Sequence, residues 1–311
     1  MKFAKVLKKS LWWIATVFIC AYALVWVLPS FFTDRVTAQE KEIILSLWHV
    51  DSFEGGKGSR AAFLNRIATA FEKSEKVTFL VSAKTAEGVK DAFQKGERPD
   101  LLSFGGYLDL SGVNAEAECW CMGKYALYSM GQTDESPTPQ NTVISNGGLN
   151  FPAVAAALEG LRGEFAQEEA LTAYTKFLNG KYTYLLGTQR DACRFQSRGA
   201  EVAVKPLNAF TDLKQYIAVV NEENREVCQR FIGYLLSEES QKLLTAIGML
   251  SEKYDIYAPD QALQNALEEV GCRYSVSPYL SAEAAKQLKS VADRVLQGEN
   301  AEVLKKFLKG G

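Results

Sequence analysis

The chain has a single histidine, and it stands in a short segment rich in groups that could bind a ligand or do chemistry. The segment LWHVDSFEGGKGSR, residues 47–60, carries an indole, an imidazole and two carboxylic acids ahead of three glycines. Indole rings stack on apolar surfaces, carboxylates accept hydrogen bonds, and glycines let the backbone approach a ligand. This combination is what binding a sugar or another small polar ligand requires.

Three enzyme interpretations of this segment are weaker. A phosphate-binding loop is excluded because Lys57 is followed by glycine and Asp51 stands where the first glycine belongs. A Ser-His-Asp hydrolase would have to use His49 with Asp51, and no nucleophile-elbow motif accompanies them. A two-carboxylate glycosidase could use Asp51 and Glu54, although residues three apart in one loop seldom flank a scissile bond. The glycosidase stays open as a lesser alternative.

The elements that must position these groups are predicted from hydrophobic spacing. Short apolar runs alternate with helical ones from residue 43 onward, which predicts an α/β fold with a parallel sheet. Ser59 is expected to cap the helix carrying Phe63, Leu64, Ile67, Ala68 and Phe71. We predict strands at residues 43–48, 77–81, 100–104, 119–130, 182–186, 202–205 and 216–220, and helices at 85–95, 151–161, 168–178, around 227–235, after Ser237 and from Ser281.

In open parallel sheets, ligands bind where the strands end and the following helices begin. The first loop offers Trp48, His49, Asp51, Glu54, Gly55 and Gly56, the loop after the third strand offers Ser103 and Phe104, and residues 187–191 offer Gln189 and Arg190. Each has a structural alternative. Trp48 and His49 could be core residues, and residues 187–191 could form a surface turn with an ordinary ion pair.

The N-terminal residues predict a membrane anchor. Lys2, Lys5, Lys8 and Lys9 precede an uncharged run from Leu11 to Leu28, which favours a cytoplasmic N-terminus with the remainder outside the cytoplasm. Cleavage of a signal peptide near residues 37–39 is the alternative.

Five cysteines follow the anchor, and an odd number cannot all pair within one chain. Cys119 and Cys121 fall on one face of a predicted strand, a geometry that suits a mutual disulfide poorly. No Cys/His spacing predicts a metal site, and we expect no cofactor. The formal net charge of −2 gives no indication of nucleic-acid binding.

A series of segments resembles the extracellular solute-binding proteins of bacterial ABC importers, above all the carbohydrate-type branch (family 1) that includes maltose- and glycerol-phosphate-binding proteins. No single segment is diagnostic, and the series runs in the family's order over nearly all of residues 43–250. The segments are ILSLWHVDSFEGGKGSRAAFLNRIATAFEK, RPDLLSFG, WCMGKYALYSM, FLNGKYTYLLGTQRDACRF and CQRFIGYLLSEESQKLLTAIGML.

The resemblance implies a two-lobed type II periplasmic-binding-protein-like fold, here preceded by one transmembrane helix. Lobe one would comprise residues 40–110 and 211–250, and lobe two residues 111–210 and 251–311, after an N-terminal part of residues 1–39. The family's ligand contacts add Trp120 and Tyr125 to the residues named above. The soluble part is shorter than is usual in the carbohydrate branch, and Gly248-Met-Leu-Ser251 replaces the family's Gly-Leu/Met-Pro pattern.

The resemblance implies a non-enzymatic, monomeric protein that captures a small polar ligand, with a sugar or sugar derivative expected, and delivers it to an ABC permease. The predicted N-terminal anchor would tether this protein to the membrane. The alternative from another class is a degenerate or sensory binding module that serves a different membrane partner.

Overall fold

The computed structural model describes Tyr22 and residues 43–50, 58–105, 108, 116–147, 149–254, 256, 272–277 and 279–310. Contacts divide the chain into the units Met1–Ile43 and Ile44–Gly311, and the strands that follow β1 all belong to the second unit. The expected membrane anchor at residues 11–28 lies outside the described residues except for Tyr22. In the part of the chain that the structure describes, no helix has the length and apolarity to cross a membrane.

The first sheet has five strands in the order β2-β1-β3-β11-β4. β1 and β3 are parallel, whereas β11 runs antiparallel to both of its neighbours, so the predicted parallel sheet is in fact mixed. The helices α3 and α4 begin where the sequence predicts, because Ser59 and Thr85 cap them. The bounds are β1 Ile43–Val50, β2 Val77–Lys84, β3 Leu101–Gly105, β4 Ala117–Cys121, β11 Gln215–Val219, α3 Arg60–Glu72 and α4 Ala86–Gln94.

The second sheet has five strands in the order β7-β6-β8-β5-β9, and it too is mixed, with β5 antiparallel to β8 and β9. Helices α6 and α7 pack against it through Tyr174, Phe177 and Phe195. The bounds are β5 Tyr125–Met130, β6 Thr142–Asn146, β7 Ala166–Glu169, β8 Tyr184–Thr188, β9 Val202–Leu207, α5 Pro152–Leu158, α6 Ala170–Leu178 and α7 Gln189–Ser197.

The single strand predicted at residues 119–130 is wrong, because it is two strands in different sheets. β4 belongs to the first sheet and β5 to the second, and residues 122–124 carry the chain between them. Gly123 sits at this crossing with no room for a side chain, since an added Cβ would lie 2.8 Å from Gln189 Oε1 and Leu213 Cβ. Residues 208–214 carry the chain back to the first sheet.

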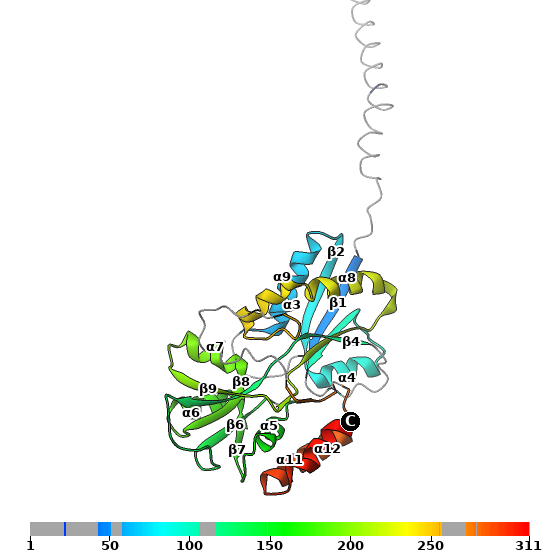
Figure 1. Cartoon of the computed structure of the whole chain (residues 1–311). Helices are drawn as coiled ribbons and strands as arrows, with labels where there is room; N and C mark the ends of the chain where they lie inside the picture. The colour runs from blue at the N-terminus through cyan, green and yellow to red at the C-terminus, as the bar shows by residue number, and fades with distance from the viewer. Residues whose placement is uncertain are drawn as a thin grey trace, which may run out of the picture. The chain divides into compact units, whose positions relative to one another are not determined.

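The C-terminal helices cover the second sheet's α5 (Figure 1). Leu288, Ala292 and Val295 of α11 join α5 and Phe210 in one buried cluster. The predicted helix around residues 227–235 and the cap at Ser237 are confirmed. The remaining bounds are β10 Phe210–Thr211, β12 Tyr274–Ser275, η2 Glu222–Asn224, α8 Arg225–Leu235, α9 Glu238–Lys242, η3 Leu243–Ile247, α11 Ala282–Leu296 and α12 Ala301–Gly310.

Candidate functional site

A buried row of polar side chains crosses the first sheet at the carboxyl end of β1 and the middle of β3. His49 and Ser103 are register partners on these two parallel strands, and His49 Nδ1 lies 3.1 Å from Ser103 Oγ. Trp120 of β4 reaches the same hydroxyl and donates from Nε1 to Ser103 Oγ at 3.1 Å. All three residues are fully buried. One serine therefore joins the only imidazole to an indole.

Helix α3 covers this row with its first turn. Phe63 stacks on Trp120 with ring centroids 5.6 Å apart. Arg60, the first residue of the helix, lies one turn earlier on the same face and is only 2% exposed. The cap residue Ser59 accepts a hydrogen bond from the Ala62 amide, and Gly58 supplies the positive φ of 84° before it. Arg60 therefore has a buried guanidinium group on the face of α3 that covers this row.

Helix α7 brings two residues from the second sheet to the first. Gln189 Nε2 donates to Gly248 O at 3.0 Å, while its Oε1 accepts from the Lys124 amide at 2.7 Å. Arg190 Nε donates to Ile247 O at 3.2 Å, and its Nη2 donates to Gly58 O. Both side chains are buried, so the alternative of a surface turn at residues 187–191 is wrong.

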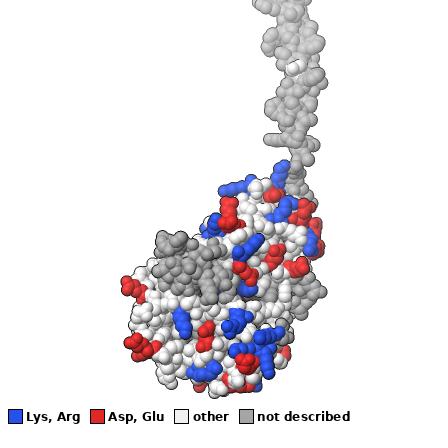
Figure 2. Space-filling view, in the orientation of Figure 1, with Lys and Arg blue, Asp and Glu red and all other residues white. Residues whose placement is uncertain are grey.

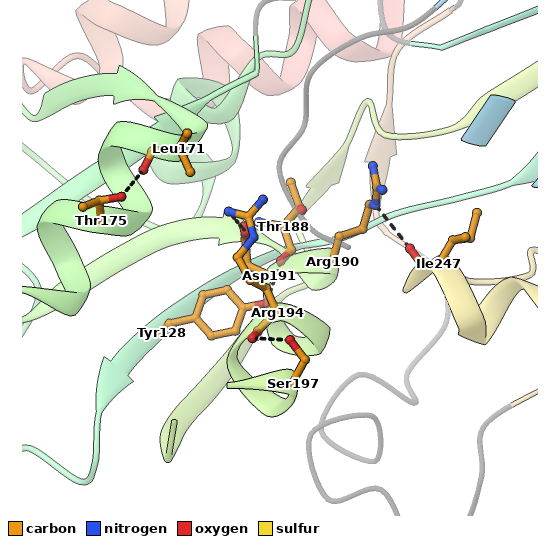
Figure 3. A network of polar contacts seen from close by, with 9 residues as sticks. All are labelled: Tyr128, Leu171, Thr175, Thr188, Arg190, Asp191, Arg194, Ser197 and Ile247. Carbon is orange, nitrogen blue, oxygen red and sulfur yellow. Dashed lines mark hydrogen bonds and ion pairs between the residues drawn. The ribbon is translucent and has the colours of Figure 1, made fainter. Parts of the chain in front are cut away.

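The start of α7 is held by a network of its own (Figure 3). Asp191 Oδ2 accepts from the Thr188 amide at 3.0 Å, and Arg194 pairs with Asp191. Tyr128 of β5 donates from its hydroxyl to Thr188 O at 2.6 Å. In Figure 3 Arg190 extends away from this network toward Ile247, which places its guanidinium on the first-sheet side.

The charges of Arg60 and Arg190 act on the buried row. Burial and, to a smaller extent, the positive charges of Arg60 and Arg190 together lower the pKa of His49 to about 3, so the ring is neutral at pH 7. Burial raises the pKa of the Cys121 thiol far above its usual value, while the same two arginines act in the opposite direction. The positive charges of both guanidinium groups thus act on His49 and on Cys121. We call His49, Ser103, Trp120, Arg60 and Arg190 the His49 cluster.

The other predicted site residues lie elsewhere. Trp48 is half-buried on the opposite face of β1, where it contacts Phe93 of α4. Phe104 packs with Trp48 in the same apolar cluster. Tyr125 donates to Asp212 Oδ1 at 2.6 Å in the core of the second sheet. Four predicted residues, namely Asp51, Glu54, Gly55 and Gly56, lie outside the described residues.

Sequence reasoning missed Arg60 as a member of the cluster. A signal was present, because arginine at the first position of a helix opposes the helix dipole and needs a local reason. The helix has no acidic residue in its first turn.

Among the described residues, no group of three His, Cys, Asp or Glu side chains could hold a metal ion. The cluster can bind and orient a ligand by hydrogen bonds and charge.

No family model and no curated protein sequence matches the chain. Solved structures do match its fold. A maltose/maltodextrin-binding domain from Bdellovibrio bacteriovorus bound to maltotriose has a TM-score of 0.52 at 13% identity, over 86% of this chain and 99% of that one. A periplasmic thiamin binding protein has a TM-score of 0.52 at 12% identity, over 84% of this chain and 97% of that one.

A two-component system protein that mediates signal transduction has a TM-score of 0.55 at 14% identity, over 80% of this chain and 99% of that one. At these identities the comparisons show the fold alone. The chain therefore has the mixed α/β, two-sheet fold of type II periplasmic solute-binding proteins.

Proposed function

We propose that the chain is the extracytoplasmic solute-binding component of an ABC importer, which captures a small polar ligand between its two sheets and passes it to a membrane permease. The observation that carries this proposal is the convergence of Arg190 and Gln189 from α7 on the end of the first sheet. A ligand at such a junction is contacted from both halves, and contacts from both halves favour the closed arrangement.

The polar row in the first sheet supports binding at this position. Ligands of open α/β sheets bind at the carboxyl ends of the strands. His49 is the second-last residue of β1, and its register partner Ser103 lies two residues before the end of the parallel strand β3. Arg190 of the second half donates to the carbonyl oxygens of Gly58, just before the helix α3 that covers the row, and of Ile247. Two lobes are part of the proposal, with residues 122–124 and 208–214 as the hinge segments between them, so β4 is assigned to lobe one with the rest of the first sheet.

The molecular surface gives no competing indication of a nucleic-acid partner. Acidic and basic side chains are interspersed on the face that Figure 2 shows. The net charge of −2 agrees with this mixture. A monomer tethered to a membrane, with its two sheets outside the cytoplasm, fits delivery to a permease.

A thermal-shift screen of the full-length protein tests the proposal. Sugars, sugar phosphates, inorganic anions, polyamines and amino acids are added one at a time. A ligand present at one hundred times its Kd adds about 2.7 kcal/mol of stability, which raises Tm by several degrees. Selective stabilisation by one chemical class is expected. A folded protein that responds to none of these compounds contradicts capture of a small solute.

A sensory module is the second candidate, because the fold is shared with a two-component signalling protein. The two candidates differ in their membrane partner. Photo-crosslinking from exposed positions on α9, such as Lys242, in the native membrane is expected to capture a permease subunit. Capture of a sensor kinase instead would favour signalling over import.

A further inference from the structure

The hinge segment that returns the chain to the first sheet is attached to the second half at three consecutive residues. Phe210 stacks on Tyr125, with ring centroids 6.4 Å apart and planes 8° apart. Thr211 Oγ1 donates to Gly123 O at 2.6 Å, and Asp212 Oδ1 accepts from the Tyr125 hydroxyl at 2.6 Å. Because Gly123 lies in the other hinge segment, the two segments are held together beside the second sheet.

Asp212 also holds the beginning of α5. Its Oδ2 accepts from the Phe151 amide at 2.6 Å, and Phe151 is the N-cap residue of this helix. A phenylalanine side chain has no acceptor for the first amides of a helix, and this N-cap makes no side-chain hydrogen bond. The carboxyl group of Asp212 therefore joins one hinge segment both to β5 and to α5.

Asp212 is buried without an ion pair in the described part of the chain. It is 5% exposed, and its hydrogen bonds come from peptide amides and from Tyr125, a phenol whose pKa burial raises well above its usual range. The charge of Lys289 on α11 acts on the carboxyl group more weakly than burial, and Lys214 of the same hinge segment pairs with Glu252. Burial therefore dominates and raises the pKa of Asp212 to about 6.

The proton on Asp212 is coupled to the position of the hinge segment. A neutral carboxyl group keeps both contacts, because one oxygen accepts from the Phe151 amide and the hydroxyl group donates to the Tyr125 oxygen. A carboxylate is better stabilised by water, which reaches it when the segment moves away from β5 and α5. An exposed aspartate has the ordinary pKa of 3.8, so between pH 3.8 and about 6 only the packed arrangement holds the proton. Raising the pH through this range favours release of the segment.

We propose that Asp212 is a proton-dependent latch of the hinge, whose neutral carboxyl group holds the returning segment against β5 and α5 and whose ionised form favours release of that segment into water. This inference rests on the hinge role that the proposed function gives to residues 208–214. A segment that leaves β5 and α5 no longer fixes the angle between the two sheets. Acid therefore restricts the hinge, and neutral pH frees it.

Native-state hydrogen exchange of the full-length protein tests the latch through the Phe151 amide, whose acceptor is Asp212 Oδ2. The protection factor, corrected for the intrinsic effect of pH on exchange, measures how often this hydrogen bond opens. It should fall about tenfold per pH unit between about pH 4 and 6, about a hundredfold in all, and then level off. Amides of the central strand β8 report global unfolding and should stay more strongly protected. Equal protection of Phe151 and β8 at every pH overturns the proposal.

Variants assign the pH dependence to Asp212. Asp212→Asn is expected to make the protection of the Phe151 amide independent of pH, and the control Asp293→Asn, an exposed aspartate on α11, to leave the fall in place. A fall that persists in Asp212→Asn overturns the assignment. Tyr125→Phe removes a donor to the carboxylate, so protection should level off at a higher pH. If Asp212→Asn does not fold, the Tyr125→Phe profile decides, and an unchanged levelling pH overturns the proposal.

The distance between two labels, one in each half, tests the effect on the hinge. Spin labels on non-natural amino acids at the exposed positions Lys73 and Lys181 avoid the free cysteines. Their distance distribution should broaden from about pH 4 to pH 7 in the unsubstituted protein and stay narrow in Asp212→Asn. Opening at the Phe151 amide with unchanged distances overturns the role in the hinge and leaves solute binding in place. A pH-dependent distance in a protein that no compound of the ligand screen stabilises supports the latch and contradicts only solute capture.

Discussion

Arg190 Nε lies 3.2 Å from the carbonyl oxygen of Ile247, and this contact joins the two halves of the protein. Arg190 belongs to α7, whose Ala192 and Phe195 pack on the second sheet. Ile247 ends η3, which packs against α3 on the first sheet. The same guanidinium donates to Gly58 O just ahead of α3. One side chain therefore links a helix of the second sheet to two backbone segments of the first.

Replacing Arg190 by Gln should loosen this junction and lower stability. The variant leaves the carbonyl oxygens of Gly58 and Ile247 without their donor. Hydrogen bonds to charged groups contribute about 1.5–3 kcal/mol each, so loss of the two bonds should lower the free energy of unfolding by roughly 3–6 kcal/mol. Denaturant unfolding measures this loss, and small-angle scattering should show a larger radius of gyration. Arg230→Gln, an exposed arginine paired with Glu75 and Glu226, is the matched control, and equal results for the two variants would contradict the role.

His49 should make the protein less stable in acid. Its pKa is about 3 in the folded protein and 6.5 as a model value. Between these values the unfolded chain binds a proton that the folded protein does not, so the free energy of unfolding falls as the pH falls from 6.5 toward 3. The slope is at most about 1.4 kcal/mol per pH unit. His49→Gln should remove this contribution, which urea unfolding at a series of pH values measures against the unsubstituted protein.

Asp212 should make the protein less stable as the pH rises, which is opposite to the effect of His49. Burial raises its pKa from 3.8 to about 6, although hydrogen bonds from Tyr125 and Phe151 and the charge of Lys289 favour the carboxylate. Between these values the folded protein holds a proton that the unfolded chain has lost, so the free energy of unfolding falls as the pH rises from about 4 to 6. Asp212→Asn should remove this fall.

The two titrations nearly cancel between pH 4 and 6, and the variants separate them. Relative to the unsubstituted protein, His49→Gln should become less stable as the pH rises through this range, and Asp212→Asn more stable. The difference in unfolding free energy between each variant and the unsubstituted protein should therefore change with pH in opposite directions. The same direction for both variants would contradict the pKa shift of His49 or that of Asp212.

The sequence predicted most elements of the first sheet because its signals are local. Ser59 caps a helix whose apolar residues recur at helical spacing, and this predicted cap is confirmed, as is the helix predicted at residues 85–95, which Thr85 caps. The division of residues 119–130 into two strands was not predicted, because only residues 122–124 separate β4 from β5 in the sequence and pairing with different partners places them in different sheets. The antiparallel direction of β11 depends likewise on partners more than one hundred residues away in the sequence.

The sequence analysis named several residues of the candidate site but did not predict how they are arranged. Alternation along β1 predicts that Trp48 and His49 lie on opposite faces, but the sequence does not predict which of α3 and α4 covers each face. Gln189 and Arg190 were predicted as ligand contacts on a loop, whereas they begin α7 and bond to backbone carbonyl groups of a distant segment. Their use as ligand contacts remains a prediction.

Gly58 offers the most local test of how the junction is packed. Its φ is 84°, and an added Cβ would lie 3.0 Å from Ile247 Cγ2. Gly180 has a similar φ of 72° with nothing within 4 Å of an added Cβ. Alanine at either position carries the backbone cost of about 1–2 kcal/mol that a left-handed conformation imposes. Only at Gly58 is the steric contact added.

Gly58→Ala should therefore lower the free energy of unfolding by more than Gly180→Ala, with an excess of roughly 1–3 kcal/mol from overpacking. The added methyl group pushes Ile247 away from residue 58, and Arg190 donates to the carbonyl oxygens of both residues. Ligand affinity should therefore fall in Gly58→Ala and stay unchanged in Gly180→Ala. Denaturant unfolding and isothermal titration of the two variants measure both differences. Equal losses of stability would mean that Ile247 has room to move, and that Arg190 alone holds this part of the junction.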